Sequence, residues 1–154
     1  MKKLFIGAIL LIASSGMRAQ YGSLDAILDI LEERKGINQN IKDINIYDTK
    51  FVSVKDFEDH TERNFIVIKA NKATYVEVFD DKKSGESTSN VFSGDVVRSN
   101  KNIISVRCDM LEGKKIPVAI TKTFLLTSQK KIVYLIDINN KDRWIDEKSF
   151  GKGK

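Results

Sequence analysis

The spacing of apolar residues along the chain changes near residue 40, from the period of an α-helix to that of a β-strand. Within residues 23–36 the apolar side chains recur at the spacing of one face of an α-helix. The side chains on this face are Leu24, Ile27, Leu28 and Leu31. Ser23 is suited to cap the first turn of the helix, and Gly36 is suited to end it. The segment therefore predicts one amphipathic helix with a buried stripe.

After residue 40, apolar and polar positions alternate, which is the period of a β-strand with one buried face. Short polar stretches separate the alternating segments. Such short connections join antiparallel neighbours, because parallel strands need long crossovers. The sequence therefore predicts an antiparallel meander, whose segments are 42–47, 50–55, 64–70, 73–79, 87–97, 102–111, 115–126 and 131–138.

One of these segments, 115–126, has a single charged position on an otherwise apolar face. Ile120, Phe124 and Leu126 lie in phase on that face, and Lys122 is its only interruption. The opposite face of the segment is half polar. This pattern predicts a strand that covers a core on one side only.

The two periods together predict an α+β fold. The helix has an apolar stripe to bury, and a twisted antiparallel sheet of six to eight strands offers an apolar face for it. We therefore expect the N-terminal helix to pack on the sheet. Periodicity alone leaves open whether the sheet curls around the helix or closes into a small barrel. It also leaves residues 140–150 as either a last short strand or a helical turn.

The first 19 residues have the pattern of a cleavable signal peptide. Lys2 and Lys3 precede an unbroken apolar run at residues 4–13, and that order is typical of an export signal. A helix that spans a membrane needs about 20 apolar residues, so the run is too short to remain in a bilayer. Small side chains favour cleavage after Ala19. We therefore expect an exported protein, periplasmic or secreted, without a transmembrane segment.

Cleavage would change the charge of the chain. The full sequence carries 26 basic and 21 acidic residues, a formal net charge of +5. Three of the basic residues and none of the acidic ones precede residue 20, so the remainder carries +2. So small a charge attracts nucleic acid or another polyanion only weakly, and we expect no nucleic-acid partner. Residues 20–150 are predicted to form one α+β domain, and residues 151–154 a disordered tail.

The single cysteine, Cys108, lies in phase with Ile104 and Val106 on the apolar face of its segment. This phase predicts a buried thiol with a packing role. A nucleophilic cysteine would need a histidine partner in an electropositive site. The only histidine, His60, lies among acidic residues instead.

Those acidic residues form the one candidate site of the sequence, the polar loop Asp56, Glu58, Asp59, His60 and Glu62. Carboxylates with an imidazole are able to bind a divalent cation, and a histidine beside a carboxylate is able to act as a general base. The spacing matches no established metal loop, because it offers neither a glycine for a sharp turn nor a second histidine. A solvated connection between two hairpins explains the same residues. We therefore predict no metal and no cofactor.

These observations favour a small exported binding protein without catalytic activity. Its partner would be a protein, which it would serve as an inhibitor or immunity-type protein, or a component of the cell envelope, because sheet edges and loops are common recognition surfaces.

Two alternatives stay open. A small hydrolase or lyase would show a pocket lined by two or more members of one set: Asp56, Glu58, His60, Glu77 and Asp109. A carrier of small molecules or lipids would show a large apolar cavity under the predicted helix.

Overall fold

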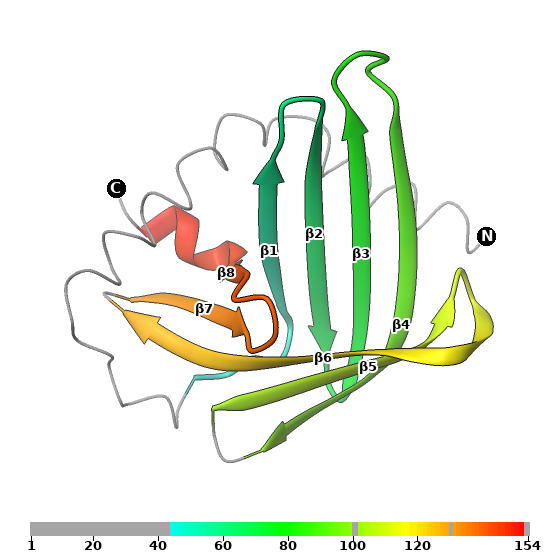
Figure 1. Ribbon diagram of the computed structural model, residues 1–154. Helices are drawn as coiled ribbons and strands as arrows, with labels where there is room; N and C mark the ends of the chain where they lie inside the picture. Colours follow the sequence, from blue (N-terminus) through cyan, green and yellow to red (C-terminus); the bar gives the residue numbers. More distant parts are fainter. Residues whose placement is uncertain (1–43, 100–101, 130, 153–154) are drawn as a thin grey trace. The chain divides into compact units, whose positions relative to one another are not determined.

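The computed structural model describes residues 44–99, 102–129 and 131–152. These residues form eight antiparallel strands, each hydrogen-bonded to the next along the chain, and the first strand also pairs with the last (Figure 1). The sheet is therefore a closed barrel. Its strands are β1 (Thr49–Asp56), β2 (His60–Lys69), β3 (Lys72–Asp81), β4 (Ser87–Ser99), β5 (Ile103–Leu111), β6 (Lys114–Gln129), β7 (Ile132–Asp137) and β8 (Arg143–Asp146), and the 3-10 helix η1 (Glu147–Lys152) follows.

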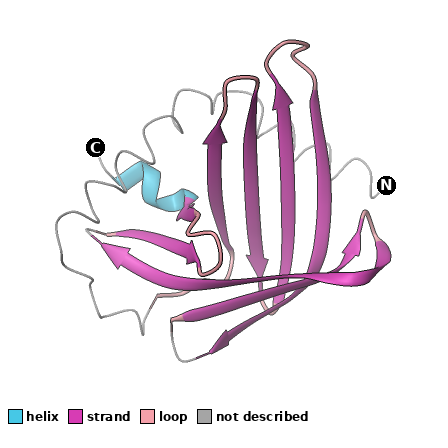
Figure 2. Cartoon of the chain, in the orientation of Figure 1, coloured by secondary structure: helices cyan, strands magenta, loops and turns pink. Residues whose placement is uncertain are grey.

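The predicted α+β class is wrong, because the described part of the chain is an all-β barrel in which η1 is the only helix (Figure 2). The helix predicted over residues 23–36 and the signal peptide over residues 1–19 lie outside the described residues. The physical reason for the error is that the sheet covers its apolar face with its own strands. A closed sheet buries that face and has no free edge.

The two ends of the strand series also differ from the prediction. Residues 44–48 lie outside any strand, so the described part of the segment 42–47 does not form a strand of the predicted first hairpin. The eighth strand comes instead from residues 140–150, which contain both β8 and the start of η1. β8 pairs with β1 through Phe51 opposite Asp146 and Val52 opposite Ile145. This short contact closes the barrel.

Two irregularities in strand pairing accompany the curvature of the sheet. The register shifts between Ser93 and Gly94 in the β4–β5 pair, and between Cys108 and Met110 in the β5–β6 pair. Bulges of this kind bend a strand and increase its twist. Figure 1 shows β5 and β6 running across the direction of β1–β4, which brings the second half of the sheet over the first.

The apolar core fills the barrel at the end that holds the β2–β3 turn. Strands β1 and β2 contribute Phe51, Ile66 and Ile68 to it, and β6 and β8 contribute Phe124 and Trp144. Tyr75 lies against Trp144, with 6.0 Å between the ring centroids. The larger side chains thus interlock across the barrel and close this end. Among the described residues no helix has the length and apolar character needed to span a membrane.

Cys108 belongs to this core, as its phase predicted, and is 1% exposed. Burial raises the pKa of its thiol to about 11, and the neighbouring Asp109 carboxylate adds to the increase. Below about pH 8 the thiol is protonated in both the native and the unfolded chain, so this shift has no effect on stability. Between pH 9 and pH 11 the unfolded thiol ionises while the native one keeps its proton, so the free energy of unfolding falls.

The variant Cys108→Ala lacks this titration. We expect the free energy of unfolding of the wild type to fall by about 2 kcal/mol more than that of Cys108→Ala between pH 8 and pH 11. Urea unfolding at a series of pH values measures the difference. Parallel curves for the two proteins would show that the native thiol titrates normally.

Candidate functional site

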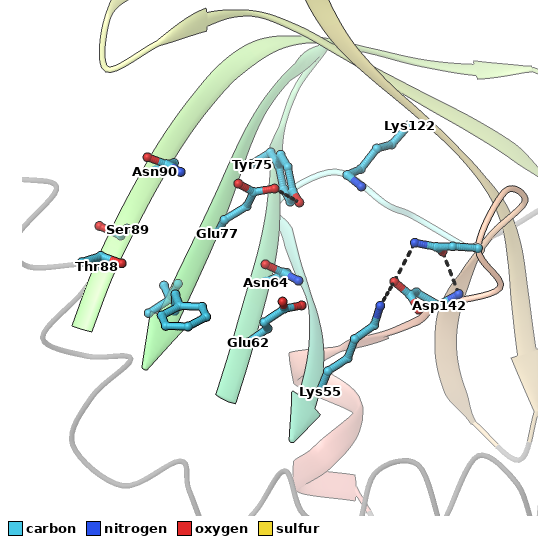
Figure 3. A pocket seen from close by; sticks show the side chains of 13 residues that line it. Lys55, Glu62, Asn64, Tyr75, Glu77, Thr88, Ser89, Asn90, Lys122 and Asp142 are labelled. Atoms are coloured by element: carbon cyan, nitrogen blue, oxygen red, sulfur yellow. Dashed lines mark hydrogen bonds and ion pairs between the residues drawn. The ribbon is translucent and has the colours of Figure 1, made fainter. Parts of the chain in front are cut away.

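The end of the barrel opposite the apolar core contains a polar pocket of about 380 Å³ (Figure 3). The inner face of β2 shows how it arises. Ile66 and Ile68 lie in the core, whereas Glu62 and Asn64, in the same phase, line the pocket. Side chains two residues apart share one face of a strand. The change from apolar to polar along this face therefore places a hydrophilic opening above a closed apolar floor.

The other walls repeat this arrangement. On β3, Ala73 and Tyr75 belong to the core and Glu77 continues the same face into the pocket, which Tyr75 also lines. Lys122, on β6, is the charged interruption of an apolar strand face and reaches into the pocket from the far side (Figure 3). Strand β4 adds Asn90. Residues far apart in the sequence therefore converge on one space.

An ion pair closes one side of the pocket. The ammonium of Lys55 lies 2.7 Å from Oδ2 of Asp142, which also accepts a hydrogen bond of 2.7 Å from the amide of Asn140. The backbone N–H of Asp142 donates to the Asn140 side chain in return. These contacts hold the β7–β8 loop in place beside β1. The charges of Lys55 and Asp142 neutralise each other.

Tyr75 connects the floor of the pocket to its charged wall. Its hydroxyl donates a hydrogen bond of 2.7 Å to Oε1 of Glu77. Burial, with the Glu77 carboxylate, raises the pKa of Tyr75 above its usual value, so the hydroxyl keeps its proton. The ammonium of Lys122 lies 5.1 Å from the centre of the Tyr75 ring, a cation–π distance. Its nearest carboxylate contact, to Oδ2 of Asp137, is 3.9 Å long.

The polar loop predicted from the sequence contributes one residue to this pocket, Glu62. The imidazole of His60 lies beside the pocket, 2.6 Å from the Asp59 carboxylate and 3.5 Å from that of Glu62. Its ring is stacked between those of Phe57 and Phe79, at 4.5 and 4.4 Å. This packing explains the position of the histidine without a ligand.

The remaining loop residues lie outside the pocket. Glu58 is exposed in the β1–β2 turn. Asp56 accepts a hydrogen bond from Thr61 and lies 2.8 Å from the ammonium of Lys82, which holds the pKa of the Asp56 carboxyl below its usual value. Within the described ranges, no three histidine, cysteine or carboxylate side chains are placed to hold a metal ion. The loop therefore serves as a connection in which Asp59 pairs with His60, while Asp56 pairs with Lys82 of the β3–β4 turn.

Each of the two alternative functions implies a pocket with its own kind of lining. Of the five residues named for a hydrolase or lyase, only Glu77 lines this one. The apolar cavity expected of a carrier of small molecules or lipids was predicted under the helix of residues 23–36, which lies outside the described residues, so that expectation stays a prediction. The pocket at the open end of the barrel is lined mostly by amide, hydroxyl and charged side chains. Sequence reasoning missed Asn64, Asn90 and the role of Lys122. In the sequence, each of these polar residues lies on the same strand face as apolar residues, and that exception could have indicated the site.

No protein-family model matches this chain, and comparisons with curated proteins and with solved structures give no significant match.

Proposed function

We propose that this protein is a binding protein that takes a small polar molecule into the open end of its barrel. The observation that carries the proposal is the pocket of about 380 Å³ inside the barrel, with hydrogen-bonding side chains from several strands. Its volume falls within the range of small-molecule sites, roughly 300–1,000 Å³. Side chains mounted on strands hold their positions better than side chains on loops, and the closed core beneath them fixes the spacing of the strands.

Binding suits this pocket better than catalysis. Thr88 and Ser89 line the pocket, but their hydroxyls make no hydrogen bond to a carboxylate or an imidazole within the described part of the chain. The Tyr75 hydroxyl does contact Glu77, but its raised pKa keeps it protonated. A hydroxyl nucleophile needs an adjacent base within hydrogen-bond reach. The proposal keeps the non-catalytic role favoured by the sequence. Its ligand is a small polar molecule, as in the alternative of a small-molecule carrier, rather than the protein or envelope partner that the sequence favoured. Export stays a prediction, since residues 1–19 lie outside the described residues.

Trp144 offers a direct test, because it is the only tryptophan of the chain and its ring packs against Tyr75, which lines the pocket. We expect at least one member of a panel of sugars, amino acids, nucleosides and organic acids to change the fluorescence of Trp144 saturably. The double variant Asn64→Leu, Asn90→Leu should weaken that binding at least about tenfold, because it removes two hydrogen-bonding groups from the walls.

The control is Asp95→Asn, at the opposite end of the barrel, where the exposed Asp95 pairs with Lys72. This variant should bind as the wild type does. Chemical-shift mapping of the bound compound should identify residues around Asn64 and Glu77. A panel that leaves both the fluorescence and these shifts unchanged at millimolar concentrations would contradict the proposal.

A further inference from the structure

The charges of the pocket are divided between its walls. Glu62 and Glu77 stand on the neighbouring strands β2 and β3, and Lys122 stands on β6. In the ring of eight strands, β6 is four positions from β2, which is the opposite side of the barrel. Figure 3 shows the two carboxylates and the ammonium facing the same space from different sides. A cavity lined in this way has a negative wall and a positive wall.

The remaining charges of the lining do not alter this division. Lys55 and Asp142 form their own ion pair at 2.7 Å. Lys122 donates no hydrogen bond to any described residue, and its 3.9 Å contact with Asp137 is longer than a hydrogen bond. Its side chain is 22% exposed. The ammonium therefore has donors free for a ligand.

The two carboxylates also keep acceptor capacity. Glu77 receives the Tyr75 hydroxyl on Oε1, and Glu62 has its Oε1 3.5 Å from the His60 imidazole. For both residues the second oxygen makes no hydrogen bond within the described part of the chain. A carboxylate accepts several hydrogen bonds. Both are therefore able to receive N–H donors from a bound molecule.

We propose that the ligand is a small zwitterion, with a primary ammonium group bound by Glu62 and Glu77 and a carboxylate bound by Lys122. This inference rests on the proposed binding function and names the chemistry of its ligand. A purely cationic ligand would be repelled by Lys122, and a purely anionic one by the two carboxylates. A neutral ligand would displace water from these charged groups without replacing the hydrogen bonds that the water makes to them. A molecule with both charges satisfies both walls.

Matched probes test this inference by calorimetry and Trp144 fluorescence. The zwitterions are ω-amino acids from glycine to 6-aminohexanoate, together with diglycine and triglycine. Each is compared with the amine that lacks its carboxylate and with the acid that lacks its amine. We expect at least one zwitterion to bind at least about tenfold more tightly than both analogues, since a ligand without one of its charged groups forgoes a charge-assisted hydrogen bond of about that strength.

Variants that each remove one charge test which wall of the pocket binds which group of the ligand. Glu77→Gln, or Glu62→Gln as an independent second change, should remove the preference for the zwitterion over the acid. Lys122→Gln should remove the preference for the zwitterion over the amine. The matched controls Asp95→Asn and Lys72→Gln remove the same charges from an exposed pair outside the pocket and should leave both preferences unchanged. Thermal unfolding of each variant verifies that it is folded.

The outcomes separate this inference from the function on which it rests. If a sugar, an amine or an acid binds in the pocket as tightly as every zwitterion, the inference is wrong and the binding function stands. If no compound in either panel binds in the pocket, both are wrong. A zwitterion could also bind while Glu77→Gln, Glu62→Gln and Lys122→Gln leave unchanged its preference over the amine and the acid. In that case the carboxylates do not bind its ammonium and Lys122 does not bind its carboxylate.

Discussion

Replacing Gly94 by alanine is expected to lower the free energy of unfolding by about 3 kcal/mol or more. A Cβ atom at this position would lie 1.9 Å from the backbone oxygen of Arg107 and 2.6 Å from Cα of Cys108. Both atoms belong to the backbone of β5, so no side chain can move aside to make room. The variant must separate β4 from β5 at the register shift next to Gly94, where the two halves of the barrel are joined.

Urea unfolding followed by circular dichroism measures this loss. Gly113→Asn is a suitable control, because Gly113 has a positive φ of 78° and nothing lies within 4 Å of its added Cβ. Asparagine tolerates that backbone conformation, so this variant should lose less than about 1 kcal/mol. If Gly94→Ala were no less stable than Gly113→Asn, the close contact between β4 and β5 would not exist in solution.

Replacing Asp80 by alanine should destabilise the protein by about 3–5 kcal/mol, the usual cost of removing one member of a buried ion pair. Asp80 and Arg63 form a bidentate contact, with Nε–Oδ2 and Nη2–Oδ1 distances of 2.6 and 2.9 Å. Their side chains are only 8% and 9% exposed. The hydroxyl of Ser87 also donates to Asp80. Alanine would leave the buried guanidinium without this carboxylate.

The double variant Arg63→Met, Asp80→Leu removes both charges and should recover part of the loss, because no guanidinium is then buried without its carboxylate. Asp95→Ala, which breaks an exposed pair with Lys72, is the control and should cost less than about 1 kcal/mol. Thermal and urea unfolding of the wild type and the three variants complete the comparison. A loss for Asp80→Ala no greater than that for Asp95→Ala would show that the buried pair contributes little.

Local patterns located most of the strands. The alternation of residues 64–70 and 73–79 corresponds to β2 and β3, and that of residues 102–111 to β5. Alternation is a property of neighbouring residues, because successive side chains of a strand point to opposite faces. The same reasoning correctly predicted that Cys108 is buried. It failed for the described residues 44–47 of the segment 42–47, which precede β1 without forming a strand.

The candidate site was visible in the sequence only as isolated exceptions. Lys122 interrupts an apolar face, and Glu62 and Glu77 each stand in phase with buried residues. Local sequence groups Glu62 with its neighbours in a polar loop, because no local pattern reveals that β6 lies opposite β2. His60, the candidate general base of the predicted loop, lies stacked between two phenylalanine rings.

The sequence by itself determined where most of the strands lie and which of their faces avoid water, since both depend on residues two apart. The tertiary structure alone decided that the sheet closes. That closure depends on β8 pairing with β1, with Ile145 opposite Val52, across more than 90 residues of chain. Such a contact depends on twist and bulges summed over the whole sheet. Closure turns a few polar positions on apolar faces into a pocket with two oppositely charged walls.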